Sequence, residues 1–247
     1  IRLSLVGSEM CIRDSCVARH FGRGRPSGRP GILPAMETAV LVLAAGRGER
    51  LGGTTPKGFV QLRGRTLLER SVAAMLAVPE VDVIQPVVPA ARHRDGDRLG
   101  LPDDSRVLAP IPGGAERQDS VALGLAALPA TVAWVAVHDA ARCLVAPGDV
   151  SRVIAAARTH GAALLAVPAH DTIKRVRDGR VVETPPRHEC WAAQTPQVFR
   201  ADLLREALAK ARAEGVVGTD DAQLVERLGV AVRVVEGSAR NLKITRP

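Results

Sequence analysis

The sequence predicts an α/β protein with a doubly wound, mostly parallel sheet of the Rossmann-like type. Short apolar segments alternate with amphipathic ones, which is the order expected of β-α units. The segment 38–44 is continuously apolar and rich in β-branched residues, as a parallel strand buried on both faces requires. Late in the chain, β-branched segments flank Asp178–Gly179, a typical hairpin turn. This hairpin predicts an arm, over about residues 169–190, that projects from the sheet.

Each expected element follows from a local pattern. In the first helix, apolar side chains recur on one face. Pro147 suits the first turn of a helix, Gly215 closes one, and Thr219 is expected to cap a last helix. We expect strands at residues 38–44, 81–88, 106–109, 131–137, 162–167 and 230–236, helices at 65–77, 115–128, 147–160 and 201–214, and hairpin strands at 172–176 and 180–184.

The first 35 residues differ in composition from the rest. They hold six arginines against Glu9 and Asp14, which is half of the formal charge of +8. Residues 21–34 are rich in Gly, Arg and Pro, a composition that cannot bury a core. We expect residues 1–35 to be a disordered leader or sequence foreign to the natural protein, with Met36 as the start of a domain that spans 36–247.

The composition argues against nucleic acid and against membranes as partners. Tyr is absent and aromatic residues make up 2% of the chain, so platforms for base stacking are scarce. No run of about 18 apolar residues occurs. The four cysteines, at 11, 16, 143 and 190, show no zinc-binding spacing, which favours a reduced, cytoplasmic protein.

A Gly-rich loop follows the first strand and carries the first functional signal. Its sequence runs Ala-Ala-Gly-Arg-Gly-Glu-Arg over residues 44–50 and reaches Pro56-Lys57 soon after. Small residues let backbone N–H groups approach a phosphate, although many such loops are only tight connections. The chain has four lysines among 34 basic residues, so a retained lysine indicates a site that needs a compact ammonium group. Lys57, Lys174 and Lys243 stand beside unusual local sequence, whereas Lys210 lies on an ordinary helix face.

Several segments together resemble one family, the 2-C-methyl-D-erythritol 4-phosphate cytidylyltransferases of the non-mevalonate isoprenoid pathway. The resemblance spans about residues 38–247. The loop is shared by many nucleotidyltransferases, but the later segments are more specific. They are Gly-Gly-x-x-Arg-x-x-Ser-Val at 113–121, His-Asp-Ala-Ala-Arg at 138–142, Asp-Thr-Ile-Lys at 171–174, Gln-Thr-Pro-Gln at 194–197, Thr-Asp-Asp at 219–221 and Asn-Leu-Lys-Ile-Thr at 241–245.

The resemblance implies a nucleotidyltransferase fold and transfer of CMP from CTP to 2-C-methyl-D-erythritol 4-phosphate, with pyrophosphate released. The attacking phosphate is already ionised, so the protein needs to position and neutralise charge rather than supply a nucleophile. Arg50 and Lys57 resemble the residues that stabilise the transition state in this family, although both could be surface charges on a loop.

Residues from several segments are expected to bind CTP. They are Ala44, Ala45, Gly46, Gly48, Gly114, Ser120 and Asp139. Asp139 would end a strand at the sheet edge where open α/β sheets bind ligands. A carboxylate beside a triphosphate needs a cation between them, so we expect Asp139 to hold Mg²⁺ or to orient a substrate hydroxyl; it could also cap the following turn. Ser120 could equally be a plain helix residue, and His138 is expected to be structural.

A second set of residues would position the methylerythritol phosphate. It comprises Arg187, Lys243, Thr172, Thr195 and Arg142, of which Arg142 could instead pair with an acid. The resemblance also implies a homodimer in which the arm completes the partner's site. Where the family has Gln and Pro, this chain has Gly58 and Cys143, and the family's closing helix is missing after Pro247. Alternatives are a ribitol-phosphate or sugar-phosphate nucleotidyltransferase, the front half of an enzyme with a cyclase domain, and a binding-only homologue.

Overall fold

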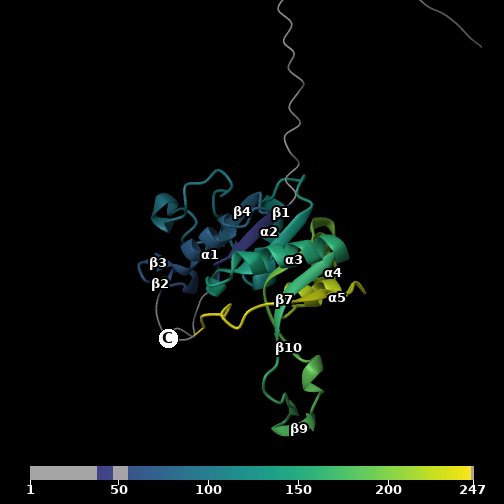
Figure 1. Ribbon diagram of the computed structural model, residues 1–247. Coiled ribbons are helices and arrows are strands. Elements are labelled where there is room, and N and C mark those ends of the chain that lie inside the picture. The colour runs from purple at the N-terminus through teal and green to yellow at the C-terminus, as the bar shows by residue number, and fades with distance from the viewer. Residues whose placement is uncertain (1–37, 47–54, 246–247) are drawn as a thin grey trace, which may run out of the picture. The chain divides into compact units, whose positions relative to one another are not determined.

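A mostly parallel sheet runs through the residues that the computed structural model describes, which are 38–46 and 55–245 (Figure 1). Its strands are β1 (Thr38–Leu43), β4 (Val83–Val88), β5 (Ile111–Pro112), β6 (Trp134–Asp139), β7 (Ala162–Pro168), β10 (Trp191–Arg200) and β11 (Arg233–Glu236). They pair in the order β11-β7-β10-β6-β1-β4-β5. β10 runs antiparallel to its neighbours β6 and β7, and the other pairings are parallel. The predicted fold class is confirmed.

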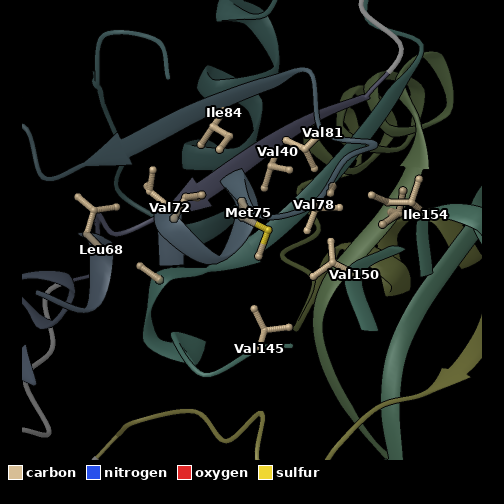
Figure 2. Packing of buried hydrophobic residues seen from close by; sticks show 14 of the residues in the cluster. Val40, Leu68, Val72, Met75, Val78, Val81, Ile84, Val145, Val150 and Ile154 are labelled. Atoms are coloured by element: carbon tan, nitrogen blue, oxygen red, sulfur yellow. The ribbon is translucent and has the colours of Figure 1, made fainter. Parts of the chain in front are cut away.

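Helices cover both faces of the sheet, as the term doubly wound requires. They are α1 (Leu67–Leu76), α2 (Arg117–Ala127), α3 (Pro147–His160), α4 (Ala201–Ala213) and α5 (Asp221–Glu226). Alternate side chains of β1 point to opposite faces: Val40 packs in the cluster that α1 and α3 cover, shown in Figure 2, and Leu41 packs in the cluster beneath α2, α4 and α5. This two-sided burial explains why β1 is apolar at every position after Thr38.

The strand order reverses beside β1. The chain passes from β1 to β4 on one side and then returns to lay β6 on the other side. The register pairs Leu43 with Asp139, so the ends of β1 and β6 lie next to each other at the carboxyl edge. Such a switch point is where open α/β sheets bind their ligands.

The strand expected at residues 106–109 is wrong in extent. Only Val107 forms a bridge, with Ile84, and the carboxylate of Asp104 accepts hydrogen bonds from the backbone and side chain of Arg106. This local turn keeps the pairing from starting before Val107, and a regular ladder forms only at β5, two residues beyond the expected strand.

Strand β10 was not expected, because its segment is polar and contains Pro196. Its pairing with β7 shifts register between Ala193 and Gln197, so residues 194–196 lie in a bulge. A bulge tolerates a residue without an N–H group, and it also turns side chains towards the sheet edge.

The helix starts follow the chemistry of their caps. Thr66 and Glu69 form a reciprocal capping box at the start of α1, two residues after the expected start. α5 begins after Asp220, whose carboxylate accepts the N–H of Gln223 at 2.9 Å, so the expected cap at Thr219 was one residue early. Shorter elements are η2 (Lys57–Phe59), β2 (Gln61–Leu62), β3 (Arg65–Thr66), η3 (Gly96–Leu99), η4 (Ala140–Arg142) and η5 (Arg187–Glu189).

The hairpin of the arm is present, with strands β8 (Arg175–Arg177) and β9 (Arg180–Glu183). Asp178 and Gly179 both have positive φ, 50° and 74°, as a tight turn between twisted strands requires. The first hairpin strand starts three residues later than expected. Figure 1 shows β9 at the far end of the segment that leaves the sheet after β7 and returns as β10.

We predict that Leu204→Ala lowers the free energy of unfolding by about 2–5 kcal/mol, because the side chain of Leu204 is completely buried between α4 and the sheet. The control is Leu123→Ala on α2, where the residue is 45% exposed and the expected change is within about 0.5 kcal/mol. Urea titrations of both variants measure the difference. Equal losses would contradict the placement of α4.

Candidate active site

A pocket opens where β1 and β6 end. Its volume is about 260 Å³, near the lower end of the roughly 300–1,000 Å³ typical of small-ligand sites. The lining residues come from five separate segments. They are Leu43, Ala44, Ala45, Gly46, Lys57, Gly58, Gly114, Ala115, Glu116, Arg117, Ser120, Asp139, Ala140, Ala141 and Lys243. The structure therefore brings together eight of the residues that the sequence predicted for the site: Ala44, Ala45, Gly46, Lys57, Gly114, Ser120, Asp139 and Lys243. Gly48 and Arg50, which were also predicted, lie outside the described residues.

Glycines bring two loops of the pocket into contact. A Cβ atom on Gly113 would lie 2.3 Å from the Cβ of Ala45, and one on Gly114 would lie 2.3 Å from the Cβ of Asp119. The hydroxyl of Ser120 accepts the N–H of Gly114 at 3.1 Å and donates to the carbonyl of Glu116 at 3.2 Å. Ser120 thus holds the loop that precedes α2, and the small residues leave the backbone as the pocket wall.

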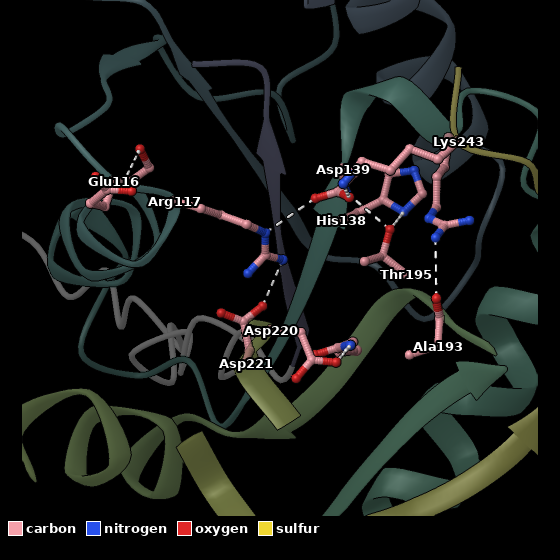
Figure 3. Close-up of polar contacts among 12 residues, drawn as sticks. Glu116, Arg117, His138, Asp139, Ala193, Thr195, Asp220, Asp221 and Lys243 are labelled. Carbon is pink, nitrogen blue, oxygen red and sulfur yellow. Dashed lines mark hydrogen bonds and ion pairs between the residues drawn. The ribbon is translucent and has the colours of Figure 1, made fainter. Parts of the chain in front are cut away.

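Asp139 is the charged centre of the pocket. Its carboxylate lies 3.3 Å from the Nε atom of Arg117 and 2.7 Å from the Nζ atom of Lys243 (Figure 3). Burial alone would raise the pKa of Asp139, but the two cations outweigh burial and lower it. Asp139 is therefore ionised and neutralised by groups from both sides of the sheet edge.

Arg117 is fixed by a second carboxylate below the pocket. Its Nη2 atom lies 2.8 Å from the carboxylate of Asp221, whose side chain is 1% exposed (Figure 3). Although burial opposes a charge on Arg117, Asp221 and Asp139 outweigh it and raise the pKa of the guanidinium group. Burial raises the pKa of Asp221, and the charge of Arg117 opposes that rise. A guanidinium group has several N–H donors in one plane, so Arg117 can bind the last residue of β6 and the first residue of α5 at once.

His138 and Thr195 support the backbone beneath Asp139. The hydroxyl of Thr195 accepts the N–H of Asp139 at 3.0 Å and lies 3.1 Å from Nδ1 of His138 (Figure 3). Because the hydroxyl oxygen of Thr195 already accepts from Asp139, we assign the hydroxyl as the donor to Nδ1 of His138, which is then the unprotonated nitrogen of a neutral imidazole. Burial lowers the pKa of His138 to about 4. The hydroxyl of Thr195 is thus used within the protein, and its expected substrate contact stays a prediction.

The other residues expected to position the second substrate lie outside this pocket lining. Arg142 donates to the backbone oxygens of Asn241, at 2.8 Å, and Ala193, at 3.2 Å. On the arm, Arg187 donates to the carbonyl of His170 and Thr172 is exposed. One chain therefore does not bring the two arm residues together with Asp139, and their roles stay predictions.

The described residues contain no group of three or more His, Cys, Asp or Glu side chains that could hold a metal by themselves. Asp139 and Glu116 are the carboxylates among the described lining residues, and Asp139 lies between two cations. A metal at this site would need further oxygen ligands from a bound substrate.

Two residues of the site were not assigned roles from sequence. Arg117 stands in the Gly-Gly-x-x-Arg segment and Asp221 in the Thr-Asp-Asp segment, and both segments were given as part of the family resemblance without a role for these two residues. Their charges and motifs were visible, but the bridge between them depends on how the fold places the start of α2 beside the start of α5.

An open α/β sheet with a small-residue loop, a switch-point pocket and converging cations defines a nucleotide-binding transferase. The chain belongs to the 2-C-methyl-D-erythritol 4-phosphate cytidylyltransferase family, whose sequence profile matches residues 38–247. A relative of that name from Symbiobacterium thermophilum is 48% identical over 85% of this chain and 88% of its own. One from Chromobacterium violaceum is 49% identical over 84% of this chain and 92% of its own.

Solved structures agree with the assignment. The crystal structure of 2-C-methyl-D-erythritol 4-phosphate cytidylyltransferase from Thermus thermophilus is similar with a TM-score of 0.68 and 38% identity, over 85% of this chain and 94% of that one. Across the residues that the structure describes, no helix is both long and apolar enough to span a membrane.

We predict that the stability of the protein falls between pH 6.5 and pH 4, because His138 is neutral when folded and takes up a proton when unfolded. Its folded pKa of about 4 lies below the ordinary value of 6.5, so the stabilisation is complete above pH 6.5 and lost as the pH falls towards 4. Replacing His138 by Asn keeps an acceptor for Thr195 and removes this titration. Between pH 7 and 4.5, urea titrations should show the wild type losing about 2 kcal/mol more than His138→Asn. Parallel losses would refute the buried neutral imidazole.

Proposed function

We propose that this chain transfers the cytidylyl group of CTP to 2-C-methyl-D-erythritol 4-phosphate, giving 4-diphosphocytidyl-2-C-methyl-D-erythritol and pyrophosphate for isoprenoid precursor synthesis. The observation that carries the proposal is the pocket of this family member at the switch point, where Arg117 and Lys243 flank Asp139 and Lys57 lines the same pocket. Cations from three segments suit two substrates that both carry phosphate.

In the proposed reaction a phosphate oxygen of the second substrate attacks the α-phosphorus of CTP. The bond from that phosphorus to the bridging oxygen breaks, and pyrophosphate leaves with the electron pair. Lys57 lines the pocket next to the Gly-rich loop, where its ammonium would stabilise charge that grows on the α-phosphate. Lys243, which lines the same pocket, would hold the attacking phosphate. No protein base is required, because the nucleophile is already an anion.

The loops that meet at Gly113 would read the base. Their close approach leaves backbone groups, rather than side chains, at this wall of the pocket. A pyrimidine ring in the pocket would lie beside Ala45 and Gly114 and form hydrogen bonds with the main chain there. Ser120 would act indirectly, because its hydroxyl already holds Gly114 and Glu116.

We also propose that the reaction uses Mg²⁺ that enters with the triphosphate. Asp139 fits such an ion as one ligand, since each carboxylate oxygen has a second acceptor site beside its cation. Phosphate and water oxygens would complete the shell. When bound, Mg²⁺ would supply charge neutralisation to the triphosphate and to the leaving pyrophosphate.

The arm supports a further proposal, that the active protein is a homodimer. Apolar side chains that are 40–58% exposed gather on this segment, which is unusual for a surface that faces only water. They are Ile173, Val176, Val181, Val182 and Trp191. A second copy of the chain would cover them and place Thr172 and Arg187 near the partner's pocket. A cytoplasmic location is proposed as well, which the free thiols of Cys143 and Cys190 support.

The activity itself is tested by measuring pyrophosphate release from CTP with methylerythritol phosphate and Mg²⁺. ATP, GTP and UTP replace CTP in parallel reactions, ribitol 5-phosphate replaces the acceptor, and EDTA removes the metal. The proposal expects turnover with CTP and methylerythritol phosphate and none with EDTA. Faster turnover with ribitol phosphate would reject the assigned acceptor.

We predict that Lys57→Ala lowers kcat on the order of 10²–10³-fold, as loss of one preorganised donor to the transition state does. Lys210→Ala is the matched control, because Lys210 is exposed on α4 and donates to the carbonyl of Arg227. Both variants remove one ammonium group, so a general charge effect would appear in both. Wild-type kcat in Lys57→Ala would exclude the proposed mechanism.

For the dimer, we predict that Val176→Asp combined with Val181→Asp yields monomers with at least about tenfold lower activity. The two valines pair across the hairpin and are 55% and 58% exposed, so paired charges there would oppose a partner surface. Val217→Asp is the control, since Val217 is 67% exposed and lies outside the arm. Sedimentation velocity reports the association state. A fully active wild-type monomer would end the proposal.

A further inference from the structure

The C-terminal segment that carries Lys243 has no regular secondary structure of its own. Residues 237–245 follow β11 and form neither helix nor strand. No ladder of backbone hydrogen bonds therefore fixes where the ammonium group of Lys243 lies. Yet its Nζ atom stands 2.7 Å from the carboxylate of Asp139.

The segment is attached to the sheet by Asn241, which lies two residues before Lys243. The side chain of Asn241 is buried, with the residue 1% exposed. Its amide Nδ2 donates to Oε1 of Gln194 at 3.1 Å and to the carbonyl of Thr195 at 3.0 Å. Both acceptors belong to the bulge of β10. Backbone contacts add support, with the carbonyl of Asn241 bound by Arg142 and the N–H of Ile244 bound by Ala141.

Thr195 connects this attachment to the other member of the ion pair. Its carbonyl accepts from Asn241, and its hydroxyl accepts the N–H of Asp139. The contacts therefore close a ring that runs from Asp139 through Thr195 and Asn241 to Lys243 and back to Asp139. Within such a ring, the position of the ammonium group depends on the amide of Asn241.

We propose that Asn241 is a positioning residue, which sets the place of Lys243 in the pocket and thereby the binding of the phosphorylated acceptor. This role rests on the proposed function of Lys243 as the group that holds the acceptor phosphate. Asn241 itself touches no substrate, because it is buried and does not line the pocket.

The chemistry of the site requires an amide at this position. Two oxygen acceptors face Nδ2, and an amide supplies two N–H groups to meet them. Gln194 cannot reverse its own amide to compensate, because its Nε2 atom donates to the carbonyl of Ser238 at 2.9 Å. An aspartate of the same shape would therefore turn a donor into an acceptor that faces two oxygens.

The test compares Asn241→Asp and Asn241→Ala with the neighbouring control Leu242→Ala, since Leu242 is 48% exposed. Steady-state kinetics give kcat and KM for each substrate. We expect KM for methylerythritol phosphate to rise at least about tenfold in both Asn241 variants, while KM for CTP changes less than about twofold. Leu242→Ala should match the wild type. Equal rises in both KM values, or no rise for the acceptor, would overturn the proposal.

A double-mutant cycle with Lys243→Ala separates positioning from general stability. If Asn241 acts through Lys243, then adding Asn241→Ala to Lys243→Ala raises the acceptor KM no further. Additive rises would show that Asn241 acts elsewhere. Should Asn241→Asp not fold, as thermal unfolding will show, the cycle with Asn241→Ser decides, since serine keeps one donor. If the wild type prefers another phosphorylated alcohol, the proposed function is wrong, and the same cycle with that acceptor still decides the role of Asn241.

Discussion

The ion contacts of Asp139 are the constraint on which the site depends. A largely buried carboxylate is costly unless cations and hydrogen bonds satisfy it, and here they come from segments that are far apart in sequence. Arg117 approaches from the start of α2, Lys243 from the C-terminal segment, and Thr195 of β10 supports the backbone N–H group. Three segments must therefore meet at the end of one strand, which also brings together the walls of the pocket.

The antiparallel strand β10 makes this meeting possible. A purely parallel sheet would place another loop beside the end of β6, whereas β10 runs back past it and carries a bulge at 194–196. The bulge presents the amide of Gln194 and the hydroxyl and carbonyl of Thr195 to neighbouring segments. The irregular part of the sheet thus has a positive role, because a regular ladder would have used the backbone carbonyl of Thr195 for strand pairing.

Sequence reasoning could predict features that follow from local pattern. The spacing of apolar residues, the glycines at turns and the helix caps predicted the α/β alternation and the arm. Motif residues at strand ends were found to line one pocket. It was wrong at residues 106–109, where a local bond of Asp104 competes with pairing, and it missed β10 because polar residues and Pro196 hide a central strand. The bridge from Arg117 to Asp221 could not be foreseen either, because it depends on how the fold places the starts of α2 and α5 side by side.

The use of arginine and lysine at this site follows from what each cation must do. Arg117 binds two carboxylates at once, and its side chain is 31% exposed, so its guanidinium group is held in one orientation. Lys243 holds one carboxylate, and its side chain is 43% exposed. The ammonium group of a lysine lies on a flexible side chain and needs no planar partner, so it can move from a carboxylate to a phosphate. The rarity of lysine in this arginine-rich chain thus fits a division in which arginine fixes the frame of the site, while Lys57 and Lys243 contact the substrates in the proposed reaction.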